Sequence, residues 1–142
     1  FDTDFTRLFT QTYSSWTGLG RWHYVFSSPF KKASLKNGWI PVTTAETVTF
    51  RRSIRMFERV TLQSEVVAWN DRCFFVRQMF LVKGELRAIS VSEGIVRCGK
   101  DHLNPTQAFK ELGTLTSSPA VPADIQAWYS MREIRKSSPA AQ

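Results

Sequence analysis

Residues 60–96 read VTLQSEVVAWNDRCFFVRQMFLVKGELRAISVSEGIV, and this run contains three strand-like segments separated by short polar turns. In the first segment Val60, Leu62 and Val66 share one face, which is the period-two pattern of a half-buried strand. Asn70-Asp71 and Lys83-Gly84 then interrupt the pattern with residues that favour turns. Residues 60–68, 73–82 and 86–96 are therefore predicted to form three consecutive antiparallel strands.

The third of these segments carries small side chains at alternate positions, at Ala88, Ser90, Ser92 and Gly94. Such a face leaves room for another element to pack closely against the sheet. Residues 39–52 are rich in Val and Thr and also favour extended structure. We therefore expect a meandering antiparallel sheet of at least four strands.

A helix is predicted before the sheet, because apolar residues recur there at spacings of three and four. Gly18 and Gly20 are poor helix formers, so their presence indicates close packing or a kink. This helix is expected to end before Ser27-Ser28-Pro29, and residues 29–37 are expected to form a basic connection. Most of the apolar stripe should face the sheet, and it consists of Phe5, Leu8, Phe9, Tyr13, Trp16, Leu19, His23 and Phe26.

Two further helices are predicted after the sheet. Asn104-Pro105 is a capping pair that opens a short helix ending at Leu112. Residues 122–136 show a second amphipathic pattern with basic residues near its C-terminal end. This last helix either covers a face of the sheet or docks against a partner.

Length and composition indicate a single domain without a membrane-spanning segment. The chain has 142 residues, of which 42% are hydrophobic, and no apolar run is long enough to cross a bilayer. Cys73 and Cys98 lack the spacing of a zinc site and are expected to be free thiols. The chain begins with Phe, as a processed or trimmed form would, so the compartment is left open, and an intracellular or mitochondrial location is compatible with it.

The charge balance favours an anionic partner, since the net charge is +7 and arginine outnumbers lysine by 12 to 7. Arg51, Arg52, Arg55 and Arg59 cluster near a strand end, where guanidinium groups could grip the phosphates of coenzyme A or of RNA. The alternative is a solvated strand end whose charge discourages aggregation.

Few other side chains suggest chemistry. His23 lies on the helix stripe and is expected to be a buried core residue, whereas His102 is expected in an exposed turn. Glu46 falls on a predicted strand and is not assigned to catalysis. The sequence therefore predicts no metal site.

The order of these pieces resembles the 4-hydroxybenzoyl-CoA thioesterase group of the hotdog superfamily, and in particular its eukaryotic THEM-type members. The resemblance rests on Gly-Trp-Ile-Pro-Val at 38–42, on Glu-Thr-Val-Thr-Phe-Arg-Arg-Ser at 46–53, and on the three strands that follow. It covers residues 1–112 and leaves 113–142 as an extension with a helix and a frayed tail.

The resemblance implies an α+β hotdog fold, in which a curved antiparallel sheet wraps a long central helix. It also implies a homodimer that pairs its sheets edge to edge, with two acyl-CoA sites at the interface. No cofactor is implied, since coenzyme A enters as part of the substrate.

In active relatives the catalytic segment holds an Asp, glycines, His and Asn shortly before a Tyr. Here that segment is Asp-Thr-Asp-Phe-Thr-Arg-Leu-Phe-Thr-Gln-Thr-Tyr at 2–13, which keeps Asp4 and Tyr13 but has Thr10 and Thr12 in place of His and Asn. The resemblance makes Asp4 the candidate carboxylate, with Asp2 as the alternative, and Gln11 or Thr10 a candidate oxyanion donor. An ordinary helix cap is the other interpretation of Asp4, and a core residue that of Tyr13.

Two functions follow from this comparison. The first is hydrolysis of an acyl-CoA or acyl-carrier thioester. The second is a catalytically degenerate hotdog domain that serves as a binding or assembly module in a larger complex, RNA-containing or not.

Overall fold

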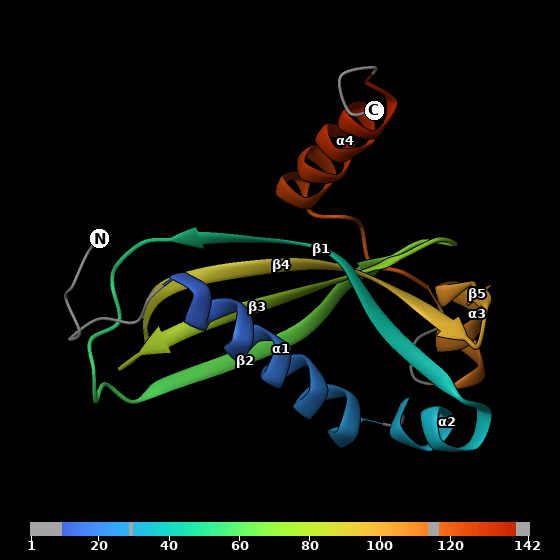
Figure 1. Ribbon diagram of the computed structural model, residues 1–142, viewed down its shortest axis with the longest axis horizontal. Coiled ribbons are helices and arrows are strands. Elements are labelled where there is room, and N and C mark those ends of the chain that lie inside the picture. Colours follow the sequence, from blue (N-terminus) through green and yellow to red (C-terminus); the bar gives the residue numbers. More distant parts are fainter. Residues whose placement is uncertain (1–9, 29, 114–116, 139–142) are drawn as a thin grey trace.

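The computed structural model of this chain describes residues 10–28, 30–113 and 117–138. Two helices precede the strands, and two follow them (Figure 1). The elements in chain order are α1 (Thr10–Ser27), α2 (Phe30–Asn37), β1 (Trp39–Phe50), β2 (Val60–Trp69), β3 (Phe74–Val82), β4 (Glu85–Cys98), β5 (Asp101–Leu103), α3 (Pro105–Glu111) and α4 (Ala123–Ser137).

The strands form one antiparallel sheet in the order β1-β4-β3-β2, and the short strand β5 also pairs with β4. Both predicted turns are confirmed. The side-chain oxygen of Asn70 accepts hydrogen bonds from the backbone N–H groups of Arg72 (2.8 Å) and Cys73 (2.9 Å). Lys83 and Gly84 both have positive φ, at 50° and 77°, which suits a tight turn between β3 and β4. The strand β5 was missed, because three residues are too few for a periodic pattern.

Helix α1 lies along one face of the curved sheet, and α4 lies on the opposite side (Figure 1). On the α1 face, Tyr13 packs in a cluster with Phe80 and Ala88. On the other face, Ile125 of α4 packs against the buried residues Ala68, Cys73, Phe75 and Val91. This arrangement confirms the predicted α+β class, and it shows that the C-terminal helix covers the sheet.

The predicted buried stripe of α1 is wrong in its described part beyond Tyr13. Leu19 is 70% exposed and His23 is exposed, so His23 is not the core residue that its position suggested. Thr17, by contrast, is fully buried, and Gly20 faces the sheet. The helix turns this narrow face inward because small residues allow its backbone to approach the strands closely.

The predicted basic connection at 29–37 is also wrong, because Phe30–Asn37 forms the helix α2. Its buried residues Phe30 and Ala33 pack in one cluster with Trp39 at the start of β1. The basic residues of this segment obscured its apolar pattern, so the helix was not predicted.

The short helix α3 begins as predicted, since the Asn104 side chain accepts a hydrogen bond of 2.9 Å from the backbone N–H of Thr106. Over the described ranges no helix is long and apolar enough to cross a membrane.

Candidate functional site

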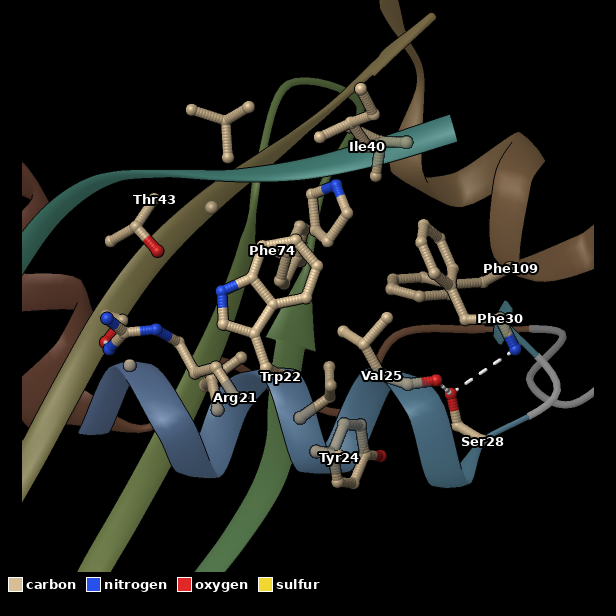
Figure 2. Close-up of a pocket in the computed structure, with 18 of the residues that line it drawn as sticks. Arg21, Trp22, Tyr24, Val25, Ser28, Phe30, Ile40, Thr43, Phe74 and Phe109 are labelled. Atoms are coloured by element: carbon tan, nitrogen blue, oxygen red, sulfur yellow. Dashed lines mark hydrogen bonds between the residues drawn. The ribbon is translucent and has the colours of Figure 1, made fainter. Parts of the chain in front are cut away.

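An apolar cavity of about 480 Å³ lies between α1 and the sheet. Its walls come from the second half of α1, the first residues of β1, the facing parts of β3 and β4, and α3. In Figure 2 the Trp22 ring rises from α1 toward β1, Phe30 and Phe109 lie at one end, and Arg21 and Thr43 lie at the other.

The small residues of β4 create the floor of this cavity. Ser92 and Gly94, two of the four small residues predicted to leave room for packing, line it together with Val96. A Cβ atom on Gly94 would lie 2.5 Å from Cζ of Phe74, so glycine lets that ring cross the strand. Among the aromatic residues, Trp22 and Phe74 line the cavity, whereas Phe80 lies in the core.

Arg21 forms the polar end of the cavity. Its Nη1 donates to Oε1 of Glu46 at 3.0 Å and to Oγ of Ser92 at 2.8 Å, with Oε1 of Gln78 at 3.5 Å. The hydroxyl of Ser90 donates to the same Glu46 oxygen at 2.9 Å. An arginine and a glutamate, each with about one fifth of its side chain exposed, thus form an ion pair beside an apolar space.

Gln78 extends this cluster toward the N-terminal half of α1. Its Nε2 donates to the backbone oxygen of Thr17 at 3.1 Å and to Oγ of Ser64 at 3.0 Å. Gln78 is fully buried, so these bonds tie α1 to the sheet where a desolvated amide would otherwise be costly. This cluster was not predicted from the sequence, although polar residues at alternate positions of apolar strands were its signal.

The predicted substrate-binding arginines lie at the other end of β1. Arg51, Arg52 and Arg55 line a second cavity of about 570 Å³, together with Ser53, Glu58 and Arg87. Arg52 pairs with Glu85 at 3.0 Å, and Arg87 pairs with Glu58 at 3.5 Å. Within the described part of the chain, neither Arg51 nor Arg55 has an ion-pair partner, so the cavity carries excess positive charge.

Tyr13 lies beside this arginine-lined cavity rather than in the apolar one. It is 3% exposed, and its ring is 4.9 Å from that of Phe50 and 5.0 Å from that of Phe80. Burial raises the pKa of the Tyr13 phenol, while a hydrogen bond with the backbone of Ile54 and the charge of Arg87 act in the opposite direction. The phenol therefore stays neutral at physiological pH, as a core residue or a hydrogen-bond donor would.

The other candidate catalytic groups fall where the structure gives no side-chain geometry. Asp4 lies outside the described residues, as does Asp2. Thr10 and Gln11 are the first two residues of α1, but their side chains lie outside the described part. Their assigned roles remain predictions.

On the opposite face of the sheet, α4 is fixed by a buried ion pair. Glu93 is 5% exposed; one carboxylate oxygen pairs with Arg132, and the other accepts a 2.7 Å bond from the hydroxyl of Thr44.

On the same side of the sheet, burial raises the pKa of the Cys73 thiol to about 11, so the thiol stays protonated at neutral pH. Cys73 and Cys98 are both free, as predicted, and among the described residues no group of His, Cys, Asp or Glu is placed to hold a metal ion.

Sequence comparison relates almost the whole chain to a thioesterase family, as the resemblance predicted. The profile of the Thioesterase-like superfamily matches residues 2–129. Protein THEM6 of Drosophila melanogaster is 25% identical over 96 residues, which is 66% of this chain and 47% of that protein. The chain therefore spans about half the length of this relative.

Structural comparison shows the fold. The probable thioesterase YbaW of Escherichia coli matches with a TM-score of 0.71 and 14% identity, over 78% of this chain and 86% of that one. A thioesterase of Thermus thermophilus, solved in complex with coenzyme A and Zn, matches with a TM-score of 0.62 and 15% identity, over 75% and 78% of the two chains. Both have the hotdog fold, which confirms the predicted architecture.

Proposed function

Because the chain belongs to the Thioesterase-like superfamily, we propose that it hydrolyses an acyl-CoA or acyl-carrier thioester. The apolar cavity of about 480 Å³ is the observation that carries this proposal. It has the size of a small-molecule site and is lined mainly by apolar side chains, as a pocket for an acyl group should be.

Hydrolysis also requires a carboxylate and a group that stabilises the oxyanion. We assign the carboxylate to Asp4, which precedes α1 in the segment that resembles the catalytic segment of active relatives. Helix N-termini present free backbone N–H groups, so the start of α1 is the candidate source of one oxyanion donor. Thr10 and Gln11 stand at that helix end and are candidates for a second donor.

The arginine-lined cavity is assigned to the phosphates of coenzyme A. Arg51 and Arg55 have guanidinium groups without an ion pair to a described residue, and arginine binds phosphate through two parallel N–H bonds. The neighbouring thioesterase from Thermus thermophilus was solved with coenzyme A, which supports this class of ligand.

A homodimer would bring the two cavities together. The apolar cavity uses Ile40 to Thr43 at the start of β1, whereas the arginines follow its last residue, Phe50. The seven steps from Thr43, the last cavity residue of β1, to Phe50 span roughly 23 Å of strand, so the two cavities are well separated within one protomer. Because β1 has no neighbour on its outer side within the described sheet, antiparallel pairing with a second β1 is open to it. Such pairing places the arginines of one protomer near the apolar cavity of its partner.

The test is release of free thiol from short, medium, long and aromatic acyl-CoAs. We expect the wild-type protein to hydrolyse part of this panel and Asp4→Asn to lose at least 100-fold in kcat. A triple Arg51, Arg52 and Arg55→Gln variant should instead raise KM, because phosphate contacts bind ground state and transition state alike.

Asp101→Asn is the matched control, since this exposed acid on β5 lies outside both cavities. Equal activity of wild type and Asp4→Asn would remove Asp4 from the mechanism. Absence of turnover by folded protein across the whole panel would overturn the proposed hydrolysis.

A further inference from the structure

We propose that the Arg21–Glu46 pair binds a neutral oxygen substituent, a hydroxyl or keto group, on the acyl chain that occupies the apolar cavity. This inference rests on the proposed function and deepens it by naming the class of acyl group. Arg21 is the one charged residue in the cavity lining that the structure describes, so a side chain of this kind needs a reason to be there.

Arg21 keeps hydrogen-bonding capacity after its contacts with the described residues are made. Every bond to Glu46, Ser92 and Gln78 uses Nη1, which leaves Nη2 and Nε without an acceptor among the described residues. Among the described residues, the only buried side-chain polar atoms that lack a hydrogen-bond partner are Nε of Arg87 and Nε of Arg97, so the unused Arg21 nitrogens are not buried. The free donors of Arg21 are therefore accessible to a ligand.

Glu46 supplies the charge that compensates Arg21. Its Oε1 accepts hydrogen bonds from both Arg21 and Ser90. Glu46 itself lies outside the cavity lining, so a hydroxyl or keto oxygen in the cavity accepts from Arg21, while Glu46 holds the guanidinium group in place and balances its charge. Figure 2 shows the Arg21 guanidinium at the end of the cavity opposite Phe30 and Phe109, next to Thr43.

The charge of the pair decides between a neutral and an ionised substituent. Arg21 and Glu46 are 3.0 Å apart and sum to zero charge. An added carboxylate would leave one uncompensated negative charge beside an apolar wall, which is costly to bury. An unsubstituted chain would displace water from the Arg21 donors when it fills the cavity, and it would offer them no acceptor in return. A neutral oxygen satisfies both conditions.

The experiment measures binding and turnover separately. Non-hydrolysable thioether analogues of octanoyl-CoA are titrated by calorimetry, with a hydroxyl or keto group at successive chain carbons, or with a terminal carboxylate. The corresponding thioesters are then assayed for hydrolysis. The proteins are wild type, Arg21→Met, Glu46→Gln, and the control Arg72→Met, which removes an exposed arginine outside the cavity.

We expect wild type and Arg72→Met to bind the best oxygenated analogue about 10- to 100-fold more tightly than the unsubstituted one. Arg21→Met should lose this preference. Glu46→Gln leaves the arginine charge uncompensated, so it should gain about tenfold in affinity for the analogue with a terminal carboxylate. This gain of binding is a result that a misfolded variant cannot produce.

Equal binding of all analogues by wild type, or failure to bind any of them, would overturn the inference. If Arg21→Met lowered kcat equally for substituted and unsubstituted substrates, Arg21 would act at the thioester itself and the inference would also be wrong. Oxygen-selective binding without hydrolysis would contradict the proposed function while supporting the inference.

Discussion

Gly20 is a residue at which α1 approaches the sheet closely. A Cβ atom there would lie 2.8 Å from Nε2 of Gln78 and even closer to the side chain of Leu62. The same Gln78 nitrogen donates to Thr17, one turn earlier on α1. The absent side chain of Gly20 therefore makes room for the amide that joins helix and sheet.

Gly20→Ala should lower the free energy of unfolding by about 1–3 kcal/mol, because the added methyl group must displace Leu62 and Gln78. Gly18→Ala is the matched control. Its new Cβ would meet only the end of Arg21, at 3.9 Å, so better helix propensity should stabilise the protein by about 0.5–1 kcal/mol. Urea denaturation of both variants measures the difference, and destabilisation by both substitutions alike would disprove the close approach.

The sequence pointed to this contact without specifying it. Glycines within a helical pattern, and small residues at alternate strand positions, indicated close packing, and both indications are confirmed at Gly20 and Gly94. The partners were beyond reach, because the register between a helix and strands about 60 residues away depends on tertiary packing. Arg21 and Glu46 could not be paired for the same reason.

At the scale of elements, α4 is held to the sheet by apolar contacts and by two ion pairs, Arg132 with Glu93 and Arg77 with Asp124. Ile125 is 1% exposed, and Arg132 lies over the Trp128 ring at 5.3 Å while it pairs with the buried Glu93. Met131 and Ile134, in contrast, are 40% and 69% exposed. The helix therefore uses only part of its apolar surface to cover the sheet.

Arg132→Met should destabilise the protein by about 3–5 kcal/mol, because it leaves Glu93 as a buried carboxylate without its partner. Arg135→Met removes the same charge from an exposed position on the same helix and should change stability by less than about 0.5 kcal/mol. Thermal unfolding followed by circular dichroism compares the two. A small effect of Arg132→Met would mean that the apolar contacts and the exposed Arg77–Asp124 pair are enough to hold α4 on the sheet.

Helices were harder to predict than strands in this chain, for a physical reason. Period-two alternation identified β2, β3 and β4, because each strand has one face against α1 or α4. The stripe on α1 misled, since Leu19 and His23 face outward while Thr17 and Arg21 face the sheet. A polarity pattern cannot identify the buried face of a helix when that face carries polar side chains. Here the polar face of α1 that meets the sheet forms part of the candidate site.

At the scale of the whole molecule, two cavities lie at opposite ends of β1. The apolar cavity surrounds its first residues, and the arginine-lined cavity follows its last. The net charge of +7 suits the phosphate-bearing substrate proposed above, and the proposed homodimer raises the question of which protomer supplies the arginines of each site. That question has a direct experimental answer, because two different defects can be placed in two different chains.

Consider a variant with Arg51, Arg52 and Arg55→Gln, and a second variant with Val25→Trp, which fills the apolar cavity from α1. If each site combines the arginines of one protomer with the cavity of its partner, each variant alone is impaired at both sites. In a mixed dimer, one site carries both defects and the other carries neither. Random exchange of equal amounts should then restore about a quarter of the wild-type rate, measured at low acyl-CoA concentration.

Subunit exchange must be shown in the same samples, for example by tagging one variant and recovering the other with it. Each variant exchanged with itself is the control and should stay impaired. Proven exchange without restored activity would mean that each chain holds a whole site, because a mixed dimer would then contain one arginine-deficient and one blocked site. Restoration would show instead that pairing at the open edge of β1 completes the site, since roughly 23 Å of strand separates the two cavities within one protomer.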